Sequence, residues 1–184
     1  MDGNDFPAYD GPMSSTFSLE HLNTCDAEQF ASAMADIWEH APWVAAQVAP
    51  QRPFASVDAM HAAMLQVVAS RDEPERVAFY AGHPELGGEA ARRGTMTAAS
   101  EDEQGTLGLG QLQGDAAAHW DALNRAYRER FGFPFILCIR RHSTASALAA
   151  FEQRLGNGRD AELQNALDEI AAITRMRLER CVTA

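Results

Sequence analysis

Apolar residues recur every three or four positions along most of the chain, which is the spacing of helices that bury one face. Asp26, with Gln29 three positions later, predicts a capping box. This box would begin a helix whose buried face runs from Phe30 to Ala41, before Pro42 ends it. Similar patterns, with their caps and breakers, predict helices over about residues 26–41, 43–48, 56–68, 74–81, 100–114, 115–131, 143–155 and 160–181.

A single run, Phe133–Ile139 (FPFILCI), has the composition of a strand, but no partner run accompanies it. We therefore interpret it as a buried extended connector. Helices joined by short loops, without strand pairs, predict an all-α, single-domain bundle of about eight helices and no sheet. Residues 1–17 are rich in Gly, Pro, Ser and Asp without periodicity, which predicts a disordered or loose tail before a domain over 18–184.

Composition narrows the classes of partner. The formal net charge of −11 and the pI near 4.9 argue against nucleic acid or an anionic membrane, because both would repel such a surface. The three cysteines include no CxxC pair, which favours reduced thiols. There is no apolar run of the roughly 18 residues that a membrane span needs, and no secretory signal pattern. These features predict a cytoplasmic protein.

The loop that begins at His83 is the first candidate for chemistry. Gly82 is suited to ending the preceding helix in a left-handed conformation, and Pro84 keeps His83 out of helical geometry. An imidazole held at the mouth of a loop can act as a general acid or base, although a structural hydrogen bond to a backbone carbonyl would also explain it. The other histidines lie in ordinary helical or surface contexts.

Ser100 and Glu103 fit the S-x-x-E capping pattern of a helix start, and Gln104 follows them. A capping box explains Ser100 and Glu103 without any ligand, and Gln104 could be solvated. The same turn could also hold the polar edge of a small heterocycle, because a helix N-terminus presents free N–H groups.

Arg177 is the second candidate, since it falls on the helix face that Leu163, Leu167 and Ile170 also occupy. An inward guanidinium needs an anion. It can pair with a core carboxylate, extend outward from the helix end, or form a fork for a substrate carboxylate or ureido group.

Other kinds of site lack support. His83 with Glu85 or Glu89 has no HExxH spacing, so we expect no metal. No GxSxG elbow is present, and Cys138 lies in an apolar run that would raise the pKa of its thiol.

Four segments together resemble one enzyme family. They are HPELGG at 83–88, SEDEQ at 100–104, LNRAYRERFGFPFILCIR at 123–140 and EIAAITRMRL at 169–178. In this order and spacing they are similar to the OHCU decarboxylases, where OHCU is 2-oxo-4-hydroxy-4-carboxy-5-ureidoimidazoline. That family converts OHCU, an intermediate of urate degradation, to (S)-allantoin.

The resemblance implies an all-helical fold without metal or organic cofactor, a small-molecule ureidoimidazoline substrate, and a homodimer, as members often form. It assigns His83 as the catalytic acid/base, with Glu103 and Arg177 also catalytic. The implied substrate-binding residues are Pro84, Ser100, Glu103, Gln104, Phe135, Ile136, Leu137, Cys138, Ile139 and Arg177. Glu103 would orient ureido or ring N–H groups, and Arg177 would hold an anionic or carbonyl oxygen.

An alternative from another class is a non-enzymatic helical interaction module that uses the His83 loop and the acidic helix start as a partner surface. It predicts no turnover of a ureidoimidazoline.

Overall fold

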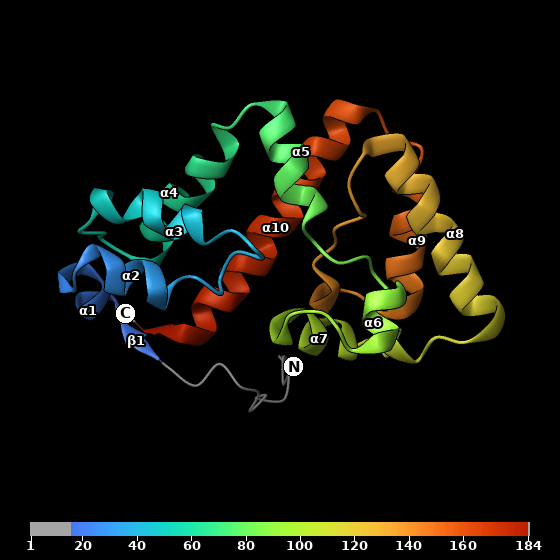
Figure 1. The fold of residues 1–184 in the computed structure, drawn as a ribbon, viewed down its shortest axis with the longest axis horizontal. Coiled ribbons are helices and arrows are strands. Elements are labelled where there is room, and N and C mark those ends of the chain that lie inside the picture. Colours follow the sequence, from blue (N-terminus) through green and yellow to red (C-terminus); the bar gives the residue numbers. More distant parts are fainter. Residues whose placement is uncertain (1–15, 184) are drawn as a thin grey trace, which may run out of the picture.

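The computed structural model describes residues 16–183, and Figure 1 shows its helical architecture. Its helices are α1 Leu19–Thr24, α2 Ala27–Ala33, α3 Pro42–Val48, α4 Val57–Ala69, α5 Glu73–Ala81, α6 Glu89–Arg93, α7 Ala98–Gly105, α8 Gly114–Phe131, α9 Thr144–Arg154 and α10 Arg159–Cys181. Short 3-10 helices follow α3, α7 and the connector, at η1 Ala49–Gln51, η2 Leu109–Gln111 and η3 Ile139–Arg141.

The all-α prediction is confirmed, with two differences. The short helices α1 and α6 were not predicted, so the described residues hold ten α-helices rather than about eight. The prediction of no sheet is wrong in detail, because Phe17–Ser18 (β1) and Val182–Thr183 (β2) pair in parallel. Strands of two residues leave no periodic pattern in the sequence. The tail expected over 1–17 lies outside the described residues except for Thr16 and Phe17.

Helix α10 is the central element of the fold. In Figure 1 it runs between α1–α4 on one side and α8 and α9 on the other. Its buried face carries Leu163, Leu167 and Ile170 in its first half, as the helical spacing predicted. Further along, the same face carries Thr174 and Arg177, which are also buried. Buried polar residues on the core-facing side of a helix indicate that the hydrophobic core ends there and that a functional site begins.

The segment between α2 and α3 differs from the prediction. The Asp26–Gln29 capping box forms, but α2 ends at Ala33 and the chain passes through turns until α3 begins at Pro42. Apolar side chains in this segment, Ile37 and Trp38 among them, are buried as a helix face would bury them. The hydrophobic pattern therefore identified the right core residues and the wrong backbone.

Residues 133–138 form a buried extended connector, as the sequence predicted over 133–139, and Ile139 begins η3. Because it has no strand partner, side chains satisfy its backbone. Arg154 Nη1 donates to the Ile136 carbonyl over 3.0 Å, and Glu169 Oε2 accepts from the Cys138 N–H over 2.8 Å. The Arg154 guanidinium also lies 4.6 Å from the centre of the Phe135 ring.

The cation of Arg154 is itself held by a buried carboxylate. Burial of Glu162 opposes ionisation, but hydrogen bonds from Arg154, Tyr127, Asn157 and Asn165 together lower the pKa of its carboxyl group. Tyr127 and Arg154 both bond to Glu162, and Arg154 bonds to the Ile136 carbonyl of the connector. This network therefore holds the connector in place.

Candidate functional site

A small pocket lies between the His83 loop, α7, the connector and α10. Its lining residues are His83, Pro84, Leu86, Ser100, Glu103, Gln104, Phe135, Ile136, Leu137, Ile139, Ile173 and Arg177. Every site residue implied by the family resemblance lines this pocket except Cys138, and Leu86 and Ile173 join them. Residues separated by up to about half of the chain are thus brought to one place by the fold.

Cys138 points elsewhere. Its backbone N–H bonds to Glu169, its sulfur lies 3.5 Å from the Met176 sulfur, and it lines a separate, smaller pocket beside Arg177. Burial raises the pKa of its thiol to about 11, as its apolar run predicted. The Cys138 side chain therefore does not line the pocket of His83, and its part in substrate binding stays a prediction.

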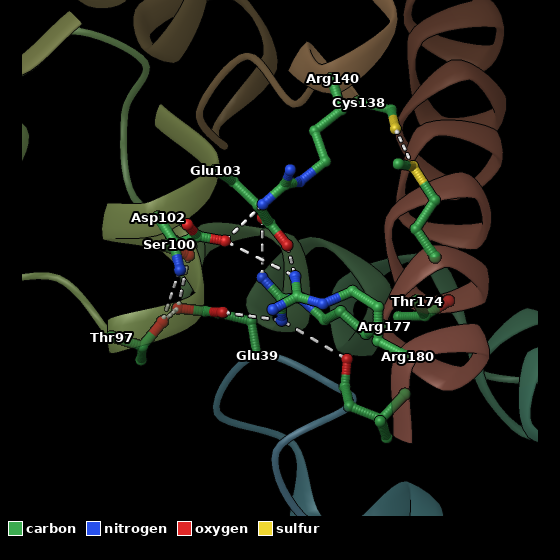
Figure 2. A network of polar contacts seen from close by, with 12 residues as sticks. Glu39, Thr97, Ser100, Asp102, Glu103, Cys138, Arg140, Thr174, Arg177 and Arg180 are labelled. Atoms are coloured by element: carbon green, nitrogen blue, oxygen red, sulfur yellow. Dashed lines mark hydrogen bonds and ion pairs between the residues drawn. The ribbon is translucent and has the colours of Figure 1, made fainter. Parts of the chain in front are cut away.

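Arg177 is buried, with 3% of its surface exposed, and two carboxylates surround its guanidinium (Figure 2). Nε and Nη2 donate to the two oxygens of Glu103 over 2.8 and 2.9 Å, which is a bidentate pair. Nη1 donates to Glu39 Oε2 over 3.1 Å. Although burial opposes the charge, the hydrogen bonds that Arg177 donates to Glu103 and Glu39, and their negative charges, raise its pKa above the ordinary value. Of the three alternatives for Arg177, the outward orientation is excluded, and the pairing with core carboxylates is present.

The sequence analysis also missed Glu39, a buried carboxylate that contacts Arg177 from outside the pocket. Its Oε1 accepts hydrogen bonds from the hydroxyls of Thr97 over 2.7 Å and Ser100 over 3.1 Å. Burial opposes its charge, but the bond from Thr97 and the cation of Arg177 lower the pKa of its carboxyl group. In the helix predicted over 26–41, Glu39 would have faced solvent beside a buried stripe. Because the helix predicted over 26–41 ends at Ala33 in the structure, the sequence analysis did not identify Glu39.

The start of α7 corrects a second prediction. Thr97, not Ser100, is the N-cap, and its hydroxyl accepts the Ser100 N–H over 3.3 Å. Helix α7 therefore begins earlier than the S-x-x-E pattern indicated. Ser100 and Glu103 lie inside its first two turns, and their side chains point to Glu39 and Arg177 instead of capping the helix.

His83 follows α5 directly. Gly82 has φ −73°, so it is not the left-handed terminator that the sequence suggested. The His83 Nδ1 lies 3.3 Å from the Phe79 carbonyl oxygen, and the Phe79 ring meets the imidazole edge-on at 5.1 Å. Because a carbonyl only accepts, Nδ1 is the protonated nitrogen in this contact, and Nε2 keeps its lone pair.

The imidazole of His83 is neutral at neutral pH. Burial, assisted by the cation of Arg177, lowers its pKa to about 4, even though Glu39 opposes that shift. A neutral imidazole with a free Nε2 lone pair can accept a proton from a bound molecule. This is the state that a general base needs before reaction.

Gln104 supports the loop instead of being solvated. Its Oε1 accepts the Gly87 N–H over 3.0 Å, and its Nε2 donates to the Glu85 carbonyl over 3.2 Å. Gly87 has φ +60°, and a Cβ there would lie 2.8 Å from Leu112 Cδ1, so this turn requires glycine. The amide of Gln104 therefore couples the His83 loop to α7.

The low pKa of His83 leads to a prediction about stability. The folded protein holds this imidazole neutral down to about pH 4, whereas an unfolded chain protonates it near pH 6.5. The unfolded state binds more protons between these values, so the stabilisation is complete above pH 6.5 and is lost as pH falls toward 4. We expect Tm to fall between pH 7 and pH 5, and to fall less in His83→Asn. Equal pH dependence of the two melting curves would contradict this.

The fold and the pocket define a helical protein with a small buried cavity, lined by one neutral imidazole and one arginine that is paired with carboxylates. Residues 23–179 match the sequence model described as OHCU decarboxylase. The chain belongs to the OHCU decarboxylase family.

Among the relatives is the 2-oxo-4-hydroxy-4-carboxy-5-ureidoimidazoline decarboxylase of Haloferax volcanii, 36% identical over 88% of this chain and 94% of that protein. The enzyme of the same name from Mus musculus is 33% identical over 85% of this chain and 88% of that protein.

Solved structures have the same fold. A crystal structure of (S)-allantoin synthase aligns with a TM-score of 0.72 at 24% identity, over 90% of this chain and 54% of that one. A crystal structure of OHCU decarboxylase in the presence of (S)-allantoin aligns with a TM-score of 0.61 at 18% identity, over 80% of this chain and 96% of that one. Within residues 16–183 no helix is long and apolar enough to cross a membrane.

Proposed function

We propose that this protein catalyses the decarboxylation of OHCU to (S)-allantoin, a step of urate degradation. The observation that carries the proposal is the pocket itself, in which His83, Glu103 and Arg177 meet as the family resemblance implies. These residues come from a loop and two helices that are distant in sequence, so their convergence is an independent feature of the fold.

The reaction breaks the bond between the ring carbon C4 and the carboxylate. The electron pair of that bond moves into the adjacent ring C=N, so the substrate provides its own electron sink and the site needs only to position, polarise and protonate. One CO₂ leaves, and the ring nitrogen that receives the electron pair takes up one proton. His83 is placed to take the proton of the C4 hydroxyl on Nε2 and to return it from one face to the ring carbon that bears the ureido group, which would fix the S configuration.

The remaining pocket residues hold the substrate. The Arg177 guanidinium offers N–H donors to a carboxylate or carbonyl oxygen, and the Glu103 carboxylate offers acceptors to ureido or ring N–H groups. The buried ring of Phe135 and the buried aliphatic side chain of Ile139 form an apolar wall of the pocket. An apolar wall disfavours a carboxylate and so favours its loss as CO₂.

The pocket is smaller than its proposed substrate. Its volume of about 40 Å³ has room for only a few water molecules. A ring that bears a carboxylate and a ureido group therefore requires the Glu103–Arg177 pair to open. Since Nε and Nη2 of the guanidinium donate to Glu103, a substrate carboxylate would take the place of the Glu103 carboxylate at that edge.

The proposed function has a direct test. OHCU would be generated in situ from urate with urate oxidase and hydroxyisourate hydrolase, and (S)-allantoin would be followed by circular dichroism. The protein is expected to give a single enantiomer faster than the spontaneous reaction, which gives a racemate. Allantoin formation at the spontaneous rate, without optical activity, would exclude the decarboxylase.

The location and the oligomeric state of the protein are two further predictions. We infer a cytoplasmic location from the composition and a homodimer from the family resemblance, and both stay predictions. Size-exclusion chromatography with light scattering tests the second.

A further inference from the structure

We propose that Glu39 is a positioning residue of this site, the fixed counter-ion that holds the Arg177 guanidinium while Glu103 exchanges its contacts for the substrate. This inference rests on the proposed function. It concerns the difference between the two carboxylates that share one arginine.

The first difference is their place relative to the pocket. Glu103 lines the pocket with Arg177, whereas Glu39 does not line it and bonds to the remaining edge of the guanidinium. Figure 2 shows the two carboxylates on different sides of Arg177. A ligand that enters the pocket meets Glu103 and the Nε–Nη2 edge of Arg177. The contact between Arg177 Nη1 and Glu39 lies beyond these groups, so the ligand leaves it intact.

The second difference is how firmly each carboxylate is held. Glu39 has donors on both oxygens, since Thr97 and Ser100 bond to Oε1 and Arg177 bonds to Oε2. The side chain of Glu39 is 3% exposed, against 13% for Glu103. Moving Glu39 would break three hydrogen bonds in a buried setting, whereas Glu103 can turn from Arg177 toward a substrate N–H and remain hydrogen-bonded. Glu103 is therefore the partner that exchanges.

The third observation is the backbone that presents Glu39. His40, the next residue, has φ +51°, a left-handed conformation that non-glycine residues rarely adopt. This turn stands between the buried Trp38 and the first residue of α3, Pro42, which together fix its ends. A buried carboxylate held by an unfavourable turn is consistent with a functional constraint on its position.

A fixed counter-ion has two consequences for the reaction. It prevents the guanidinium from following Glu103 when that pair opens, so Arg177 keeps the geometry of a bidentate fork. It also contributes a negative charge near His83, together with Glu103 from α7 and against the cation of Arg177 from α10. Removing that charge would favour the neutral imidazole down to a lower pH.

The test compares Glu39→Gln and Glu39→Asp with the parent protein. Asp36→Asn is a control that removes one negative charge from an exposed position in the same segment between α2 and α3. OHCU generated at neutral pH would be diluted into buffers of different pH, and folding would be checked by circular dichroism and melting curves. We expect Glu39→Gln to lower kcat/KM by about 10- to 100-fold, the effect of losing a residue that orients a ligand-binding group. The acid limb of its pH profile should move to lower pH.

The aspartate variant keeps the charge and makes the inference testable even if Glu39→Gln does not fold. It should keep the acid limb of the parent and lose part of the rate. Unchanged kcat/KM in Glu39→Gln, or an acid limb that moves as far in Glu39→Asp or Asp36→Asn as in Glu39→Gln, would overturn the positioning role. A parent protein that gives no allantoin above background would instead overturn the proposed function, so the two failures are distinct.

Discussion

Replacing His83 with alanine is expected to lower kcat by about 10²- to 10⁴-fold, the usual contribution of a positioned acid/base group. The variant loses the Nε2 lone pair that would take the proton, while Glu103 and Arg177 still hold the substrate. KM should therefore change much less than kcat. The fold should persist, because His83 lies in a loop and its side-chain bond is one contact with the Phe79 carbonyl.

The measurement is the rate of (S)-allantoin formation by circular dichroism, with the enantiomeric purity of the product. His119→Ala is a matched control, since this histidine is exposed and its partner is Glu152 on α9. The His83→Ala product should approach a racemate, because protonation by solvent occurs on both faces. If His83→Ala retains the parental rate and optical purity, the proton is delivered by another group and the assignment of His83 is wrong.

The sequence allowed much of this site to be located, because its residues sit on regular patterns or in family motifs. Arg177 was placed inward by the spacing of Leu163, Leu167 and Ile170, and it is buried as that spacing predicts. The connector over 133–139 was recognised as buried and extended because it lacked a partner run. The first prediction depends on helical periodicity and the second on apolar composition, and a single sequence shows both directly.

Glu39 could not be found in this way. The hydrophobic pattern from Phe30 to Ala41 suits a helix, but α2 stops at Ala33 and turns carry the chain onward. Contacts with distant parts of the chain stabilise this backbone, since the Glu39 carboxylate bonds to Thr97 at the start of α7 and to Arg177 on α10. Long-range pairing of this kind leaves no spacing in the sequence. The two-residue strands and the true N-cap at Thr97 were missed because short local elements give weak signals.

The burial of the pocket residues also makes a partner surface a weaker explanation for them. A docking surface presents its polar groups to solvent, whereas Glu39, Ser100, Gln104 and Arg177 are all buried. Their hydrogen bonds are made to one another and to the His83 loop. Such an arrangement is suited to enclosing a small molecule.

Replacing Arg177 with alanine is expected to have the largest effect on stability. An inward guanidinium without an anion would destabilise the fold, and its removal would then raise Tm. The structure shows the opposite case, because Arg177 neutralises Glu39 and Glu103 in a buried setting. Removing the cation leaves two carboxylates close together, which should cost about 3–5 kcal/mol of the free energy of unfolding. For a chain of this size that corresponds to a fall in Tm of roughly 10 °C.

The pH dependence of this loss has a definite sign. Without Arg177 the folded state loses the cation that lowers the pKa of the Glu39 carboxyl group, so burial raises that pKa above its value in the unfolded chain. A raised pKa in the folded state means that stability is lost as pH increases. The difference in Tm between the parent and Arg177→Ala should therefore be larger at pH 7 than at pH 5. Adding Glu103→Gln to Arg177→Ala should recover part of the loss, since it removes one of the two unpaired charges.

Melting curves with and without allantoin separate the structural role of Arg177 from its role in binding. Arg177→Lys keeps a cation near Glu39 and Glu103, so it should melt closer to the parent than Arg177→Ala does. It loses the planar fork, however, and allantoin should stabilise it less than the parent. If allantoin raises the Tm of Arg177→Ala and of the parent equally, then Arg177 serves only the buried ion pairs, because a ligand that contacts its guanidinium must bind more weakly without it.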